Sequence, residues 1–233
     1  MLLLNHQGRE FCVAHFQGKT YRNFSSLLKH INRQKVQLPD DVEIVTTCNH
    51  PDTSMLIGQL SKNDIPYINK VPTGCYWNNL KKISYVNEAL QEVKSKYVLI
   101  LDASDVLITR SIKTIVERFG QHNKQILFGA DKHNYPNQLV DKIPNRDFRG
   151  EFRYLNAGTC FGFLEACRSF YLQANEVLLN GNIYNPYNSE QLIIRHTFKN
   201  LTDIVDFDYE CSIFQTFVGA TVKDIGNKQY MIV

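Results

Sequence analysis

Several features that define common classes of protein are missing from this sequence of 233 residues. It contains no apolar run long enough to cross a membrane, and its opening leucines meet polar residues at once, without the basic segment of a signal peptide. Lys and Arg number 26 against 23 Asp and Glu, an excess too small for a nucleic-acid-binding face. We therefore expect a cytoplasmic protein with no transmembrane segment and no nucleic-acid partner.

Cysteine pairs are missing too. The six cysteines show no CxxC spacing, and none has a second Cys or a His at the spacing of a zinc finger. In a chain of this length without an export signal, free and mostly buried thiols are expected rather than a disulfide framework or a zinc site. The cysteines stand at positions 12, 48, 75, 160, 167 and 211.

Internal repeats, low-complexity tracts and linkers are likewise missing, so we expect a single domain. Short β-branched or aromatic runs alternate with segments of helical period, which is typical of an α/β protein with a mostly parallel sheet flanked by helices. The expected strands are 10–16, 41–47, 66–71, 97–101, 125–130, 154–163 and 204–207. The expected helices are 54–62, 78–93, 111–119, 165–179 and 190–198, with a further one starting near Asn23 or Ser25, and 131–151 is expected as a surface loop.

The apolar run Tyr97 to Leu101 is short enough to be a buried central strand, and it is followed by two acids, Asp102 and Asp105. Ligands of open parallel sheets bind beyond the carboxyl ends of the strands. Two hard oxygen ligands in that place can hold Mg²⁺ or Mn²⁺, which in turn neutralises a diphosphate. A turn-capping Asp102 beside a solvated Asp105 is the alternative, and the spacing alone does not separate the two.

Other phosphate chemistries fit less well. An aspartyl nucleophile of the haloacid-dehalogenase type goes with acids two residues apart, whereas position 104 is Ser and the acids here are three apart. The P-loop and GxGxxG patterns are both missing, which argues against the common nucleotide-binding loops.

Five segments taken together resemble the glycosyltransferase domain of the lysyl hydroxylases and its smaller free-standing relatives. Their order and spacing follow that family from about residue 97 to 217, while the N-terminal half matches in pattern only. The segments are VLILDASDVLI (98–108), ILFGADKHNYP (126–136), RYLNAGTCFGFLEAC (153–167), NSEQLIIRHTF (188–198) and VDFDYECSIFQ (205–215).

The resemblance implies a GT-A-like, Rossmann-like fold, a UDP-sugar donor and Mn²⁺ or Mg²⁺ bridging its phosphates. We expect one glycosyltransferase domain over 1–233, with about 1–108 as the nucleotide-binding half and about 109–233 as the donor-sugar and acceptor half. The expected reaction is transfer of a hexose to a hydroxyl of a glycan, glycolipid or protein. A catalytically weak nucleotide-sugar- or glycan-binding relative is the first alternative. A nucleotidyltransferase is the second, although the single Gly in HFQGKTY is little support for its phosphate loop.

Residue by residue, the resemblance places the metal on Asp102 and Asp105. Ser104 stands where the animal enzymes have an aromatic residue, so a base-stacking role there is lost or moved. Asn156 and Gly158 match the pair that lines the donor sugar, with a turn-forming role as the alternative for Asn156.

Glu190 and Gln191 match the end of an acidic run near the reacting sugar. The two positions before them, which are more acidic in the family, are Asn188 and Ser189 here. For Glu190 the alternative is a first-turn carboxylate that stabilises the helix dipole. Lys82 is expected to meet phosphate or to lie on the surface, and Trp77 to line the base pocket or to pack in the core.

One departure concerns the metal. The family takes a third ligand from a His beyond the Ile-Phe-Gln segment, and no His follows His196 in this sequence. Neither His196 nor His133 matches that ligand. Water or another residue is expected to complete the coordination, unless the sequence is a truncated or weakened form of the enzyme.

Overall fold

The structure is a computed structural model that describes residues 2–17, 24, 27–28, 31, 35–136, 150–227 and 229–232. Its helices are α2 (Met55–Lys62), α3 (Lys81–Leu90), α4 (Ile112–Phe119), α5 (Leu164–Asn180) and α6 (Glu190–Phe198), with a 3-10 turn, η2 (Pro51–Thr53). Its strands are β1 (Leu2–Leu4), β2 (Val13–His15), β3 (Val42–Thr47), β4 (Tyr97–Asp102), β5 (Val106–Ile108), β6 (Ile126–Asp131), β7 (Tyr154–Phe163), β8 (Val205–Phe207), β9 (Phe214–Thr216), β10 (Val222–Gly226) and β11 (Gln229–Ile232).

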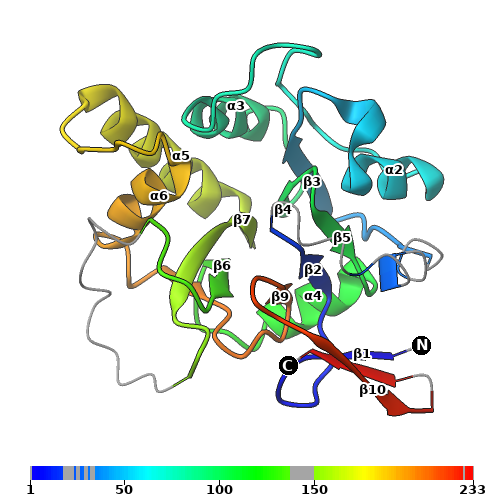
Figure 1. The fold of residues 1–233 in the computed structure, drawn as a ribbon. Coiled ribbons are helices and arrows are strands. Elements are labelled where there is room, and N and C mark those ends of the chain that lie inside the picture. The colour runs from blue at the N-terminus through cyan, green and yellow to red at the C-terminus, as the bar shows by residue number, and fades with distance from the viewer. Residues whose placement is uncertain are drawn as a thin grey trace.

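A five-stranded sheet forms the centre of the molecule, in the order β3-β4-β7-β6-β8 (Figure 1). β3 pairs parallel with β4, and β6 pairs parallel with β8. β7 pairs antiparallel with both β4 and β6, so four of the five strands run in one direction. The sheet is therefore the mostly parallel one that the sequence predicts.

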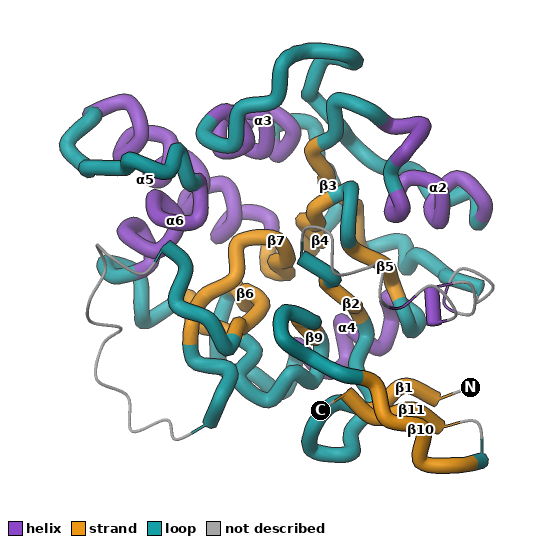
Figure 2. Tube along the Cα trace, viewed as in Figure 1, coloured by secondary structure: helices purple, strands orange, loops and turns teal. Residues whose placement is uncertain are grey.

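Helices cover both faces of this sheet (Figure 2). Along β4, Val98 and Ile100 pack in one core with α3, α5 and α6, while Leu99 and Leu101 pack in a second core with α2 and α4. Successive side chains of a strand point to opposite faces, so a continuous apolar run is what a strand covered on both sides requires. The α/β, helix-flanked class is confirmed.

The two ends of the described chain meet in two smaller sheets. β2 lies between β5 and β9, antiparallel to the first and parallel to the second. β1 and β10 pair on either side of β11, at the edge of the molecule where Figure 1 shows both termini. As a result, the N-terminal strand β2 is brought beside the turn that joins β4 to β5.

Most predicted elements are present with boundaries shifted by a few residues. Two predictions need correction: 66–71 is not a strand, and the helix expected over 78–93 is confined to α3. At 66–71 only Ile68 bridges to β3, because the side chain of the next residue, Asn69, hydrogen-bonds the backbone of Cys48 instead. The starting positions proposed for the first helix, Asn23 and Ser25, and most of the loop 131–151 lie outside the described residues.

All six cysteines are free, as the sequence predicts, and five of them are buried. Among the described residues, no helix is both long and apolar enough to span a membrane.

Candidate functional site

Two adjoining cavities, of about 210 and 420 Å³, open at the carboxyl ends of the central strands and share the side chains of Asp102, Asp105 and Glu190. Together they have the size of a small-molecule site rather than of a site for an ion alone. The smaller cavity is also lined by Thr47, Cys48, Asn49, Trp77, Asn79, Lys82, Ala103 and Ser104. The larger is also lined by His15, Gln17, Asp131, His133, Tyr135, Asn156, Gly158, Gln191 and Val218. All nine site residues expected from the sequence line one or both.

Lys82 lies between two of the shared carboxylates. Its side chain is only 7% exposed; its ammonium group contacts Asp102 Oδ1 and lies 3.3 Å from Glu190 Oε1. Burial opposes the charge of Lys82, but the Asp102 and Glu190 carboxylates outweigh it and raise the pKa of Lys82. A surface lysine is thereby excluded, and α3 places a permanent positive charge at the floor of the smaller cavity.

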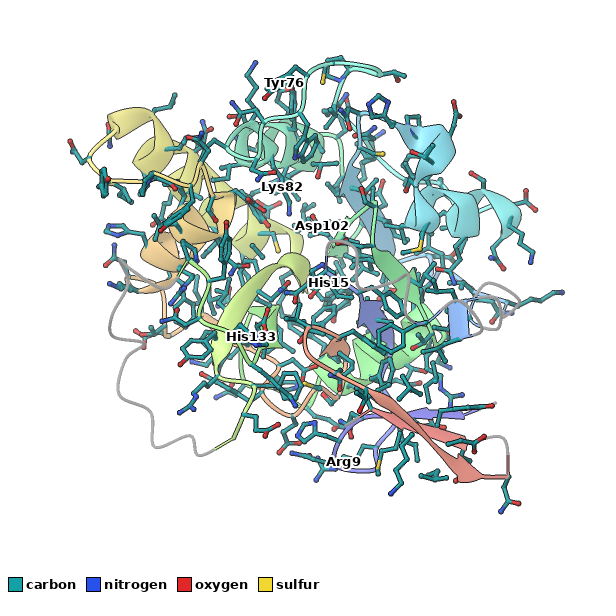
Figure 3. The ribbon with its side chains drawn as sticks, viewed as in Figure 1. Arg9, His15, Tyr76, Lys82, Asp102 and His133 are labelled. Atoms are coloured by element: carbon teal, nitrogen blue, oxygen red, sulfur yellow. The ribbon has the colours of Figure 1, made fainter. Side chains whose placement is uncertain are left out.

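His15, at the end of β2, lies next to the acids on the side away from Lys82 (Figure 3). Its Nε2 is 3.5 Å from Asp105 Oδ1, and one donor atom from each of His15, Asp102 and Asp105 lies within 4.8 Å of the others. Burial lowers the pKa of His15, but the carboxylates of Asp105 and Asp102 together outweigh burial, and the net pKa is raised.

Asn156 and Gly158 support the His15 ring from β7. Asn156 Oδ1 lies 3.0 Å from His15 Nδ1 and accepts a hydrogen bond of 2.9 Å from the Gly158 N–H. The pairing of β7 with β6 shifts register here, because Phe128 pairs with Cys160 and Gly129 with Asn156. Such an irregularity re-aims side chains at the end of a strand, and here it turns Asn156 toward the cavity.

Gly158 has no room for a side chain. A Cβ at this position would clash with His15 Cε1 and would lie 2.8 Å from Asp102 Oδ2 and 2.9 Å from His15 Nε2. Asp102 Oδ2 and His15 Nε2 therefore face the same small space over the Gly158 backbone, while Asp102 Oδ1 faces Lys82.

α6 begins at the site, with Glu190 as its first residue. Gln191 is engaged with backbone at both ends of its amide: Oε1 accepts from the Ala157 N–H at 3.0 Å, and Nε2 donates to the Tyr135 carbonyl at 2.6 Å. Gln191 thus ties α6 to β7 and to the segment after β6. Glu190 stands in the first turn, as the dipole role requires, and it also contacts Lys82 across the cavity.

Trp77 is partly exposed and lines the smaller cavity together with Ser104 of the β4–β5 turn, so it does not pack in the core. Its indole N–H donates to Asn79 Oδ1 at 2.5 Å, which leaves the ring faces for other contacts. Trp77 is the only aromatic residue among the described residues that line this cavity.

His15 and Asp131 were missed by sequence reasoning. Both are polar residues at the end of an apolar strand, the same signal that marks Asp102. Asp131 is buried and accepts from Gln17 Nε2 at 2.6 Å. The signal was available at His15, but nothing in the local sequence says which strand ends share an edge.

Residues 77–229, about two thirds of the chain, match the family model described as the PLOD GT domain. The chain belongs to this family. The resemblance inferred from the five segments is thereby confirmed, and the PLOD GT domain match covers every site residue named above except His15 and Gln17 and the three from Thr47 to Asn49.

Two curated proteins show the same relationship. Procollagen-lysine,2-oxoglutarate 5-dioxygenase of Drosophila melanogaster is 30% identical over 86 residues, 35% of this chain and 12% of that protein. Procollagen-lysine,2-oxoglutarate 5-dioxygenase 1 of Mus musculus is 22% identical over 151 residues, 60% of this chain and 19% of that protein. The chain thus corresponds to a small part of either relative.

Solved structures are more distant. A197 from STIV has a TM-score of 0.35 and 16% identity, covering 68% of this chain and 78% of its own. A 4-diphosphocytidyl-2C-methyl-D-erythritol synthase from Anaerococcus prevotii has a TM-score of 0.36 and 13% identity, and the match covers 74% of this chain and 88% of that chain. At these TM-scores the likeness says nothing further about this chain.

Proposed function

We propose that this protein is a divalent-metal-dependent glycosyltransferase that moves a hexose from a UDP-sugar to a hydroxyl of a glycan, glycolipid or protein. Membership of the PLOD GT domain family supports the glycosyltransferase class. The observation on which the metal dependence rests is the charge of the cavities. Four carboxylates, Asp102, Asp105, Asp131 and Glu190, line them, against one described Lys or Arg, Lys82.

A diphosphate would meet net repulsion in such a site unless a cation came with it. The residues fit a cation: carboxylate oxygens are the donors that Mg²⁺ and Mn²⁺ prefer, and the missing side chain of Gly158 keeps the space beside Asp102 Oδ2 open. Asp102 and Asp105 would hold the ion. When bound, it supplies positive charge that neutralises the diphosphate of the donor and of the departing UDP.

The chain's own groups divide between the two cavities. We assign the uridine and phosphates to the smaller cavity, where Trp77 offers a stacking face and Lys82 a positive charge, with Ser104 at its rim. We assign the hexose and the acceptor hydroxyl to the larger cavity, where Asn156 and Gly158 line the wall. Most residues of the smaller cavity come from 1–108, whereas the larger cavity takes residues from both expected halves, 1–108 and 109–233.

Glu190 lines both cavities and so lies where the hexose would meet the phosphate. A carboxylate there stabilises positive charge that develops on the anomeric carbon as the bond to phosphate breaks. Gln191, bound to the backbone on both sides, keeps the start of α6 in place. Both residues retain the active-site role proposed from the sequence, Glu190 in contact with the sugar and Gln191 next to it.

The test is release of UDP from a panel of UDP-hexoses by the full chain, with Mn²⁺, with and without acceptors of the three classes. We expect UDP release with one donor, increased by an acceptor and abolished by EDTA, by Asp102→Ala and by Asp105→Ala. Asp41→Ala is the matched control, since Asp41 is an exposed acid just before β3, beside Tyr97 at the opposite end of β4 from Asp102.

Other outcomes are equally informative. Metal-dependent donor binding without release of UDP under any condition would favour the binding relative over the enzyme. Incorporation of a nucleoside monophosphate from a nucleoside triphosphate would favour nucleotidyl transfer. Turnover that is unaffected by EDTA and by both Asp variants would overturn the metal dependence.

A further inference from the structure

His15, Asp102 and Asp105 converge on one space from separate strand ends, and His15 is the only nitrogen donor among them. Its side chain is 5% exposed, so its position is set by packing rather than by solvent. The Asp102 oxygen that faces His15 is Oδ2, whereas Oδ1 is occupied by Lys82. Asp102 Oδ2, one carboxylate oxygen of Asp105 and Nε2 of His15 therefore all face the same space.

Asn156 determines which nitrogen of His15 carries a proton. The amide orientation of Asn156 is fixed twice, because its Oδ1 accepts from the Gly158 N–H at 2.9 Å and its Nδ2 faces Asp131 Oδ2 at 3.4 Å. The same Oδ1 lies 3.0 Å from His15 Nδ1. An amide oxygen only accepts, so Nδ1 must donate and the neutral ring keeps its lone pair on Nε2.

We propose, on the basis of the proposed function, that His15 Nε2 is the third protein ligand of the metal and that Asn156 is the residue that orients it. A metal-binding His usually donates its other ring N–H to a fixed acceptor, which sets the tautomer and the ring orientation. Asn156 supplies that acceptor. The ligand set then joins the N-terminal strand β2 to the turn after β4, and any side chain at position 158 would push His15 away.

A nitrogen ligand also bears on the choice of ion. Mg²⁺ takes oxygen ligands almost exclusively, whereas imidazole suits first-row transition ions. We therefore assign Mn²⁺ rather than Mg²⁺ to the site, and we assign the preference to His15.

The first experiment is an Mn²⁺ titration of the full chain without nucleotide, followed by electron paramagnetic resonance. We expect His15→Ala to weaken binding at least tenfold, since even a group behind the ligand is worth about that much. His133→Ala is the matched control: His133 lines the same cavity but lies beside Asp131, outside the triad, and its loss should leave Mn²⁺ affinity unchanged. In competition experiments with Mg²⁺, His15→Ala should lower the ratio of the affinity for Mn²⁺ to the affinity for Mg²⁺.

A second measurement does not depend on the folding of any variant. Pulsed electron paramagnetic resonance of Mn²⁺ bound to wild-type protein should show coupling to a histidine nitrogen, which changes when the protein is labelled with ¹⁵N-histidine. The coupling should persist in His133→Ala and vanish in His15→Gln. Bound Mn²⁺ without histidine coupling in the wild type would overturn the assignment of His15.

Asn156 is tested by two variants of similar size. Asn156→Asp keeps an acceptor for His15 Nδ1, and Asn156→Leu removes it, so we expect near-normal Mn²⁺ affinity in the first and a loss on the order of tenfold in the second. Equal affinity in the two variants would overturn the orienting role.

The failure of this inference differs from the failure of the proposed function. If Asp102→Ala and Asp105→Ala abolish Mn²⁺ binding while His15→Ala leaves it intact, the acids hold the metal and His15 is not a ligand. If the wild-type chain binds no Mn²⁺ with or without UDP-sugars, the metal dependence and the ligand assignment fall together.

Discussion

The ammonium group of Lys82 on α3 contacts the carboxylate of Asp102 at the end of β4 and lies 3.3 Å from the carboxylate of Glu190 on α6. Three elements from different parts of the chain thus meet through one buried cation. Removing it would leave two partly buried carboxylates, 28% and 17% exposed, without a counter-charge, which is the costly way to break an ion pair.

Lys82→Met should therefore lower the free energy of unfolding by about 3 kcal/mol, measured by urea denaturation without added metal. Lys81→Met is the matched control, because Lys81 is the exposed neighbour on the same helix and should cost less than about 0.5 kcal/mol. Equal effects of the two variants would show that the Lys82 contacts do not stabilise the fold.

Glu190→Gln tests whether the acid at the start of α6 acts in the reaction. A dipole role predicts a stability loss of at most ~1 kcal/mol with turnover retained. A role in the transition state predicts a kcat reduced on the order of 100-fold, with folding and metal-dependent donor binding intact. We expect the second result in a UDP-release assay. Glu165→Gln, in the first turn of α5, is the control that should leave kcat unchanged, and normal turnover by Glu190→Gln would make Glu190 structural.

Gly158→Ala should weaken Mn²⁺ binding at least tenfold and lower stability by about 1–3 kcal/mol, because the added methyl would displace His15 and crowd Asp102. Calorimetric titration and thermal denaturation measure the two effects. Gly58→Ala on α2 is the control: a Cβ there meets nothing within 4 Å, and a helical Gly→Ala change should stabilise by about 0.5–1 kcal/mol. Unchanged Mn²⁺ affinity in Gly158→Ala would contradict the ligand geometry.

Asp208 orders the segment that leads into β9, which pairs with the strand of His15. Its buried carboxylate accepts from the backbone N–H groups of Ser212, Ile213 and Phe214 and from the Ser212 hydroxyl. Asp208→Asn turns an NH₂ group toward these donors, so we expect a loss of about 2–3 kcal/mol by urea denaturation. Ser212→Ala removes a single donor and should lower the free energy of unfolding by about 1 kcal/mol or less. A larger loss in Ser212→Ala than in Asp208→Asn would exclude the role assigned to Asp208.

Thiol labelling separates Cys75 from the other cysteines. Burial raises the pKa of Cys12 to about 12, so at pH 8 its thiolate fraction is on the order of 10⁻⁴, and the thiolate is the nucleophile. Cys75 is the one cysteine that is not buried. Mass spectrometry after brief iodoacetamide treatment of the native protein should find the label at Cys75 alone, and Cys75→Ser should abolish it. Rapid labelling of Cys12 would contradict the packing around β2.

The local sequence pattern determined where most of the longer helices and strands of this protein lie. The apolar run of β4, the extent of β7 and the start of α6 follow from hydrophobic period and length, because each element buries a face whose period is set by its own geometry. The spacing of Asp102 and Asp105 after a buried strand, and the order of five segments, were enough to indicate the family and a candidate metal site. The short strands β1, β5, β9, β10 and β11 were missed, since runs of three to five residues are given their structure by partners elsewhere in the chain.

Only the tertiary structure decided which polar residues share the site. His15 and Asn156 are 141 residues apart in the chain, and the family pattern places its His ligand downstream of the Ile-Phe-Gln segment rather than on β2. The order of strands places β2 beside the β4–β5 turn, and the register shift in β7 turns Asn156 toward it. A sequence records which side of each element is apolar, but the contacts among strand ends depend on pairing between distant segments. That pairing is a property of the folded sheets, not of any local stretch of the sequence.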